Sequence, residues 1–380
     1  MRAPDSAATA GDAKTTPGRG HSLRLDTITH RFATTTAVRG VSLEVSAGEL
    51  VALLGPSGCG KSTLLRIIAG FIRQSEGAVR YDGEPVDHLP PNRRGAGIVF
   101  QNYALFPHMT AAHNVAYGLE ARGDSRARVA EMLALVQMLG LAERYPSQLS
   151  GGQQQRIALA RALAVEPKIL LLDEPFGALD KNLRLDMQVE VKRLQRLYGV
   201  TTIMVTHDQE EALGMADRIA VLNHGAVEQF ASPVEIYDRP ATLFVNQFVG
   251  TANLLSGVID SVDGDECRVG FPGGESLVCR GNGFAAGARV LVSIRPERLR
   301  LAATPGPGRL RAKVGIIMPL GPTLVYDLTL ANGAAVRVAA PRPELAAVPA
   351  SGSEVFLEST APDACLLFPE PASQQAGAKP

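Results

Sequence analysis

A glycine-rich loop between an apolar strand and a helix is the feature that most constrains how this chain folds. It reads Gly55-Pro56-Ser57-Gly58-Cys59-Gly60-Lys61-Ser62-Thr63, after the apolar run Leu50–Leu54 and before the helical run Leu64–Ala69. The loop fits the pattern GxxxxGK[ST] in the strand–loop–helix setting that a phosphate-binding loop needs. Its glycines let backbone N–H groups point at phosphate oxygens, and the following helix adds the positive end of its dipole. The sequence therefore predicts an α/β fold with a phosphate site at the end of a strand.

All residues of this loop, 55–63, are predicted phosphate contacts, and two of them have roles of their own. We expect Lys61 to contact the β- and γ-phosphates of a nucleotide and Ser62 to ligate Mg²⁺ through its hydroxyl. Cys59 is either a redox-sensitive thiol beside a lysine or a small residue tolerated in the loop. A chance glycine-rich turn is the alternative for the whole loop, and the flanking strand and helix argue against it.

Two acids at the end of a second apolar strand complete a predicted hydrolytic site. The run Ile169–Leu172 leads directly into Asp173 and Glu174. An aspartate at a strand end can hold Mg²⁺, directly or through water. The next carboxylate is then placed to polarise the water that attacks the γ-phosphate. Acids also cap strands or start turns, and Pro175 follows. The two acids therefore indicate a hydrolytic site only in combination with the phosphate loop.

Hydrophobic periodicity divides the chain into two parts. Up to about residue 250, apolar strands alternate with helical patterns, which predicts a largely parallel sheet covered on both faces. The expected strands are Leu50–Leu54, Ala96–Phe100, Lys168–Asp173 and Thr201–Thr206, and the expected helices are Lys61–Ala69, Arg126–Leu139, Gly152–Ala164 and Lys181–Tyr198. After about Asn253, short alternating segments between Gly, Pro and Asn turns predict a small β-barrel or sandwich. These segments are Arg289–Ile294, Arg311–Ile317, Leu324–Leu330 and Ala335–Val338.

Composition and charge limit the functional classes. Lys+Arg and Asp+Glu are 38 each in the 380 residues, so no excess charge draws the chain to nucleic acid or anionic lipid. No apolar run approaches the length of a membrane span, so work at a membrane requires docking onto membrane partners. The four cysteines lack CxxC spacing, which disfavours a disulfide framework or a zinc site. Residues 1–20 lack an apolar signal core and predict a disordered leader, and residues 370–380 predict a flexible tail.

The run Leu149-Ser150-Gly151-Gly152-Gln153 makes the chain resemble the ABC ATPase family. A serine hydroxyl and two glycines at a helix start form a second anion cradle, although a lone SGG could also be a helix cap. One chain has no need of two γ-phosphate cradles. The resemblance implies a head-to-tail dimer, in which this signature closes on ATP held by the opposite subunit. It also implies an ABC ATPase domain with a helical subdomain over residues 21–250.

The remaining landmarks of that family match in order. By the resemblance, Gln101 is the Q-loop glutamine that senses Mg²⁺ and the attacking water. Ala178-Leu179-Asp180 corresponds to the D-loop along the dimer seam. His207 corresponds to the switch histidine that contacts the γ-phosphate, whereas a lone histidine after a strand is usually structural. Phe32 falls where the family places an aromatic that stacks on adenine, and a core phenylalanine is the rival interpretation.

The carboxyl-terminal part, residues 251–369, is similar to the all-β, OB-like TOBE domain. The similarity rests on Gly250–Leu255 and on Ser293-Ile294-Arg295-Pro296-Glu297. It implies the ATP-hydrolysing subunit of a bacterial importer on the cytoplasmic face of the inner membrane. The expected partners are a second ATPase subunit, two transmembrane permease subunits and an extracytoplasmic solute-binding protein, with ATP and Mg²⁺ at the site and no nucleic acid. A generic β-barrel that only stabilises the dimer is the alternative.

The sequence leaves alternatives open for the transported cargo and for the functional class. The wording of Phe100–His108 and Phe176–Lys181 looks most like importers of polyamines and 2-aminoethylphosphonate, with ferric iron as a further candidate. The apolar segment 102–110 either lines the groove for a membrane subunit's coupling helix or packs inside the helical subdomain. A soluble ABC ATPase outside transport and a purely regulatory subunit are the alternatives from other classes. The single ATPase core disfavours the first, and the intact Glu174 and His207 disfavour the second.

Overall fold

The computed structural model describes residues 20–119, 125–177, 179–281, 283–342 and 348–370. The predicted leader, except Gly20, and the predicted tail, except Glu370, lie outside these residues, as does Ala178 of the predicted D-loop. The chain forms two compact units that divide between Arg239 and Pro240. The sequence had suggested a division near residue 250.

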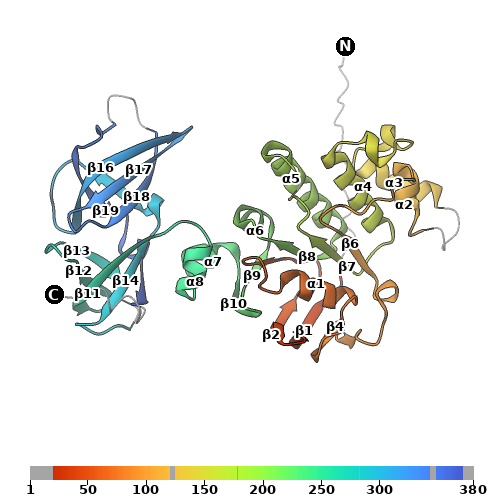
Figure 1. Ribbon diagram of the computed structural model, residues 1–380, viewed down its shortest axis with the longest axis horizontal. Coiled ribbons are helices and arrows are strands. Elements are labelled where there is room, and N and C mark those ends of the chain that lie inside the picture. Colours follow the sequence, from red (N-terminus) through yellow and green to blue (C-terminus); the bar gives the residue numbers. More distant parts are fainter. Residues whose placement is uncertain (1–19, 120–124, 178, 282, 343–347, 371–380) are drawn as a thin grey trace, which may run out of the picture. The chain divides into compact units, whose positions relative to one another are not determined.

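A mostly parallel sheet of six strands carries the phosphate loop in the first unit (Figure 1). Its strand order is β10-β9-β3-β8-β7-β6, and only the β9–β10 pair is antiparallel. All five residues of β3 and all six of β8 are buried, which explains their continuous apolar or β-branched character. The strands are β3 (Leu50–Leu54), β6 (Ala96–Val99), β7 (Ile169–Asp173), β8 (Thr201–Thr206), β9 (Arg218–Asn223) and β10 (Ala226–Ala231).

A second, antiparallel sheet in the same unit was not predicted from the sequence. It has the order β2-β1-β4-β5, with β1 (Leu23–Phe32), β2 (Thr35–Val45), β4 (Glu76–Tyr81) and β5 (Glu84–Pro85). Helix α1 (Lys61–Ala69) contacts β2, β7 and β8, and its apolar side chains share one core with both sheets. The phosphate loop therefore leads into a helix that is packed between two sheets.

A group of helices is inserted between β6 and β7. Helices α2 (Ala111–Ala116), α3 (Arg126–Leu135) and α4 (Gly151–Ala164) contact one another (Figure 1). The prediction for α3 ran to Leu139 and was too long. The helix ends because Gln137 adopts φ +60° and the N–H of Met138 donates to the carbonyl of Leu133 at 2.7 Å, a helix end usually made with glycine. The other helices of this unit are α5 (Lys181–Tyr198), α6 (Gln209–Met215) and α7 (Pro233–Asp238).

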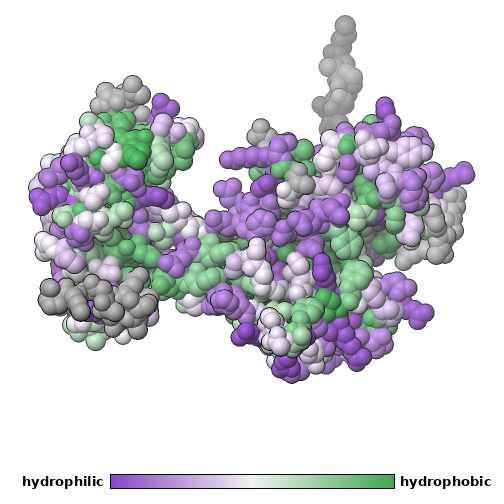
Figure 2. Space-filling view, viewed as in Figure 1, coloured by the Kyte–Doolittle hydropathy of each residue, from purple (hydrophilic) through white to green (hydrophobic). Residues whose placement is uncertain are grey.

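The second unit contains two antiparallel sheets of five strands each, which share one apolar core. One sheet has the order β13-β12-β11-β14-β20, with β11 (Asn253–Asp263), β12 (Glu266–Gly270), β13 (Ser276–Arg280), β14 (Arg289–Ile294) and β20 (Cys365–Pro369). The other has the order β15-β19-β16-β17-β18, with β15 (Leu299–Ala302), β16 (Arg309–Leu320), β17 (Thr323–Leu330), β18 (Ala335–Pro341) and β19 (Glu354–Ser359). The prediction of an all-β domain is confirmed. Figure 2 shows hydrophobic residues at the surface over β16 and β17, where Ile316 and Leu320 are exposed.

A short helix, α8 (Leu243–Phe248), belongs to the second unit by its hydrogen bonds. Asn246 is fully buried, and its Oδ1 accepts a hydrogen bond from the Ser293 hydroxyl at 2.8 Å. Nη1 of Arg295, which is also buried, donates to the carbonyl of Asn246 at 3.1 Å. These contacts fix α8 to β14 and to the turn that follows it.

The four cysteines are free thiols and all are buried. Cys59 lies in the phosphate loop, and the other three lie in the core of the second unit. Cys267 faces Cys279 across the β12–β13 pair, and the Cys365 thiol and burial both raise the pKa of Cys279. Their spacing in the sequence gave no sign of this cluster.

None of the helices among the described residues is long and apolar enough to cross a bilayer.

Candidate functional site

The phosphate loop has the backbone conformation that its glycines predict. Gly58 and Gly60 have φ values of +81° and +101°, a region that side chains rarely adopt. A Cβ on Gly60 would lie 2.3 Å from the carbonyl oxygen of Ala37 on β2. Gly60 is also the residue immediately before α1, so the loop turns directly into the helix. Only glycine fits at this position.

Lys61, the first residue of α1, folds back over the loop. Its ammonium group donates hydrogen bonds to the carbonyl oxygens of Gly55 at 2.7 Å and Pro56 at 2.9 Å. The side chain is buried, so its charge is held at the mouth of the loop rather than in solvent. Burial raises the pKa of the Cys59 thiol, against the effect of Lys61. The geometry therefore favours the interpretation of Cys59 as a small packed residue over a reactive thiol.

Ser62 and Asp173 meet at the carboxyl ends of β3 and β7. The Ser62 hydroxyl donates to Oδ1 of Asp173 at 3.2 Å. Burial raises the pKa of Asp173, and the Ser62 hydrogen bond opposes that shift. A hydroxyl beside a carboxylate is an oxygen donor set that suits Mg²⁺, which keeps several of its positions for water and phosphate. Among the described residues no group of three or more His, Cys, Asp or Glu forms a metal site.

Glu174 lies between the two side chains expected to work with it. The Gln101 amide donates to its Oε2 at 3.0 Å. Nδ1 of His207 lies 3.3 Å from its Oε1. Glu174 itself has φ +45°, and its N–H donates to the carbonyl of Val205 at 3.0 Å, so the turn after β7 is fixed to β8. Residues far apart in the sequence thus converge on one carboxylate.

The signature residues start α4 and lie against the start of α5. Ser150 is the N-cap of α4, and its hydroxyl and the Gln153 side chain form a capping box. A Cβ on Gly152 would lie 2.9 Å from the Leu183 side chain, so the glycine permits close packing of the two helix starts. Asp180 caps α5 by accepting a hydrogen bond from the N–H of Leu183 at 3.0 Å.

Within this chain, the hydrogen bonds of the Ser150 and Gln153 side chains are with each other's backbone, as the capping box requires. A Cβ on Gly151 would lie 3.6 Å from the Leu179 side chain. These neighbours belong to the signature itself and to the start of α5, and none is a residue of the phosphate loop. The pairing of the signature with an opposite subunit stays a prediction.

Phe32 is exposed at the end of the β1–β2 hairpin. It pairs with Thr35 across the turn, and 48% of the residue is accessible. Its ring makes an edge contact with His30, with the ring centroids 4.4 Å apart at 82°. The alternative of a core phenylalanine is wrong, because about half of the residue is exposed.

Two arginines were not predicted from the sequence, although their hydrogen bonds fix loops around the candidate site. Arg161 on α4 donates to the carbonyls of Tyr103 at 2.9 Å and Ala104 at 2.8 Å, and it stacks over the Phe106 ring. Arg184 on α5 donates to Asp208, the residue after His207, at 3.0 Å. A cation in the first turn of a helix opposes the helix dipole, and this was the available signal for Arg184.

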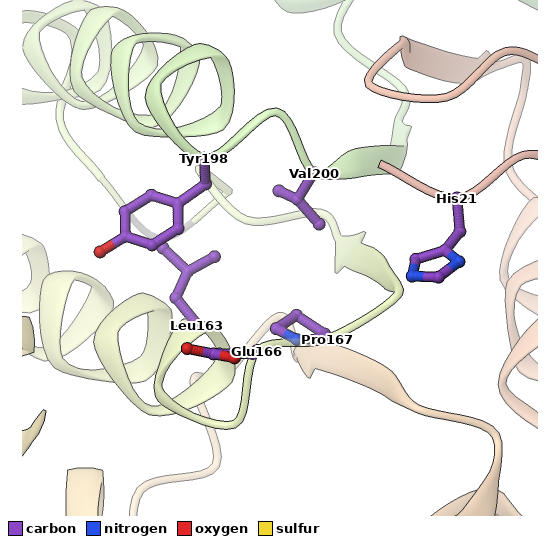
Figure 3. Close-up of a pocket in the computed structure, with 6 residues that line it drawn as sticks. All are labelled: His21, Leu163, Glu166, Pro167, Tyr198 and Val200. Atoms are coloured by element: carbon purple, nitrogen blue, oxygen red, sulfur yellow. The ribbon is translucent and has the colours of Figure 1, made fainter. Parts of the chain in front are cut away.

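A cavity of about 280 Å³ lies away from this site. Figure 3 shows the six residues that line it, which are His21, Leu163, Glu166, Pro167, Tyr198 and Val200. Pro167 and Val200 precede β7 and β8, whereas Asp173 and Thr206 end these strands. The cavity is therefore at the amino ends of the parallel strands, and the candidate site is at their carboxyl ends.

Comparison with known families agrees with this geometry. The ABC transporter family matches residues 38–177, and the TOBE domain matches residues 292–368. The first match contains the phosphate loop, Gln101, the signature, Asp173 and Glu174.

Known proteins give the same result over longer stretches. The spermidine/putrescine import ATP-binding protein PotA of Rubrobacter xylanophilus is 48% identical over 83% of this chain and 85% of that protein. PotA of Pseudomonas fluorescens is 48% identical over 87% of this chain and 93% of that protein. A dimeric structure of a bacterial ABC transporter cassette has 36% identity and a TM-score of 0.51 over 56% of this chain and 98% of its own. The chain therefore belongs to the ABC transporter family, as an ATP-binding subunit with a carboxyl-terminal TOBE domain.

Proposed function

We propose that this chain hydrolyses ATP to power a bacterial importer of polyamines such as spermidine and putrescine. The observation that carries the hydrolytic part is Glu174, held between the Gln101 amide at 3.0 Å and His207 at 3.3 Å. The identity to PotA proteins over most of the chain supports the cargo. The ATP-hydrolysing residues alone would equally suit an importer of 2-aminoethylphosphonate or of ferric iron.

The residues of the phosphate loop bind and orient ATP. Phosphate oxygens accept from the backbone N–H groups of residues 57–63 and compete with two loop carbonyls for the Lys61 ammonium. Phe32 offers its exposed ring to the adenine. Ser62, Asp173 and the Gln101 amide would hold Mg²⁺, which neutralises charge on the phosphates when bound. Each residue of the loop thus contributes to binding before any bond breaks.

Glu174 orients water, and its neighbours keep it in place. Its carboxylate accepts a proton from the attacking water, and the hydrogen bond from Gln101 fixes the direction of the carboxylate. His207 contacts the γ-phosphate and stabilises the charge that develops there, together with Lys61.

The signature completes the site from a second copy of the chain. Ser150 and the N–H groups at the start of α4 face the γ-phosphate of ATP bound to the opposite subunit. Gly151, Gly152 and Gln153 shape that helix start, and Asp180 lies at the seam. The similar cassette whose structure is dimeric supports this arrangement. Closure of the pair moves two permease subunits at the cytoplasmic face of the membrane, and a solute-binding protein delivers the cargo outside.

One experiment tests both parts of this proposal. The complete complex, purified with its permease and binding-protein partners, is assayed for ATP hydrolysis with and without spermidine. We expect stimulation by spermidine in the wild type, and in Glu174→Gln we expect ATP-bound dimers with turnover reduced by at least about 100-fold. Turnover by Glu174→Gln at the wild-type rate would remove Glu174 from its role. Hydrolysis that spermidine does not stimulate would keep the proposal that this chain hydrolyses ATP, and it would exclude polyamines as cargo.

A further inference from the structure

One arginine joins the starts of two helices that follow loops of the site. The loop that contains Leu179 leads into α5, and the segment that contains His207 leads into α6. Arg184 lies in the first turn of α5, where Nη2 donates to the carbonyl of Leu179 at 3.3 Å. Its Nη1 donates to Oδ2 of Asp208 at 3.0 Å. A single guanidinium thus contacts one loop and the residue next to the switch histidine.

A buried carboxylate closes this arrangement. The Glu211 side chain is 4% exposed, and its Oε1 lies 3.9 Å from Nε of Arg184. Its Oε2 accepts from the Thr206 hydroxyl at 2.6 Å, and the same hydroxyl oxygen accepts from the N–H of Asp208 at 2.9 Å. These contacts therefore link Arg184 to the residues on either side of His207.

The chemistry of the guanidinium suits this position. Its planar fork holds two acceptors, Oδ2 of Asp208 and the carbonyl of Leu179, in one geometry, whereas a lysine ammonium is a single flexible point charge. Asp208 also caps α6, with its Oδ1 accepting from the N–H of Glu210 at 2.8 Å. Without Arg184, Asp208 and Glu211 would be neighbouring carboxylates with no cation between them, and their repulsion would displace the backbone that carries His207.

We propose that Arg184 is a positioning residue that couples the loop ending at Asp180 to the switch histidine. When that loop shifts at the subunit seam, the guanidinium transmits the shift to Asp208 and so to His207. This inference rests on the proposed hydrolysis at a shared interface. Arg184 acts through His207 and has no contact with ATP in this role.

The test compares ATP hydrolysis and ATP binding by the full-length complex with Arg184→Met. This variant removes the charge and the fork but keeps an unbranched apolar side chain in place of the aliphatic part of arginine. We expect kcat to fall on the order of 10- to 100-fold, because a small displacement of a catalytic group has effects of this size. The KM for ATP should stay within about threefold, because the phosphate loop is untouched. Arg184→Lys, which restores the charge without the fork, should recover only part of kcat.

Arg193→Met is the matched control. Arg193 lies on the same helix and pairs with Glu190 one turn earlier, at 2.8 and 3.0 Å, away from both loops. We expect it to lose stability with kcat unchanged. An equal loss of kcat in both variants would overturn the proposal, as would an Arg184→Met complex with kcat within twofold of wild type. If Arg184→Met does not fold, a wild-type kcat in Arg184→Lys overturns it instead.

The same assay separates this inference from the function on which it rests. A wild-type complex that does not hydrolyse ATP removes the proposed function and this inference with it. A wild type that hydrolyses ATP beside an equally active Arg184→Met complex removes the inference alone.

Discussion

Burial of Glu211 should give the stability of the first unit a pH dependence of its own. Burial raises the pKa of Glu211 above its usual 4.5, and the neighbouring charge of Asp208 acts in the same direction. The Thr206 hydroxyl, Arg184 and His207 oppose that rise. A carboxyl group with a raised pKa stabilises the folded state below its unfolded-state pKa, and this contribution is lost as pH rises through the folded-state pKa.

Glu211→Gln removes this titration and keeps an acceptor for the Thr206 hydroxyl. Over the pH range above the usual 4.5, we expect the wild type to lose stability relative to Glu211→Gln as the pH rises. The measurement is the difference between the two thermal midpoints of the first unit at each pH. A difference that is constant across this range, or that changes in the opposite direction, would contradict the prediction.

Local sequence patterns place single residues, but they do not predict the contacts between distant ones. Lys61, Asp173 and Glu174 follow from local patterns, because a loop or a strand end places each of them. The link between Arg184 and Asp208 depends on how far a long side chain reaches between two helices, and no local pattern encodes that distance. The same holds for Arg161, which contacts a loop more than fifty residues earlier in the chain.

At the scale of elements, two helices offer a matched test of the signature. Ser150 starts α4 and Ser232 starts α7, and each serine forms a capping box with the residue three positions later. Replacing either serine by alanine should cost about 1 kcal/mol of stability, because each loses the same kind of cap. Only Ser150→Ala should also reduce kcat, because its hydroxyl faces phosphate in the proposed dimer. Thermal unfolding and ATPase assays on both variants check this, and equal kcat values would argue against the signature's role.

The elements that were predicted correctly are those whose ends are marked in the sequence. Helix α5 runs from Lys181 to Tyr198 as expected, between the Asp180 cap and Gly199 in the left-handed conformation. Helix α3 has no such glycine, and a glutamine took the left-handed position that ended it. In the antiparallel sheet, β1–β2 and β4–β5 are local hairpins, but β4 pairs with β1 across about 50 intervening residues, and a local pattern contains no information on that pairing.

At the scale of the whole molecule, the two units have separate apolar cores. Calorimetry should therefore resolve two thermal transitions, and a nonhydrolysable ATP analogue with Mg²⁺ should raise only that of the first unit. At 100 times the dissociation constant, the added stability is about 2.7 kcal/mol. Lys61→Ala is the control and should show no shift. A shift of both transitions together would mean that the units unfold as one.

The buried thiols can report how often each unit opens locally. A buried thiol reacts with an alkylating reagent only when the structure around it opens, so the rate of reaction reports the free energy of that opening. The reaction rate of Cys59 reports opening around the phosphate loop. The reaction rates of Cys267, Cys279 and Cys365 report opening of the core of the second unit. Because each unit holds its own thiols, one protein sample under native conditions records two independent opening rates, with no label added by mutation.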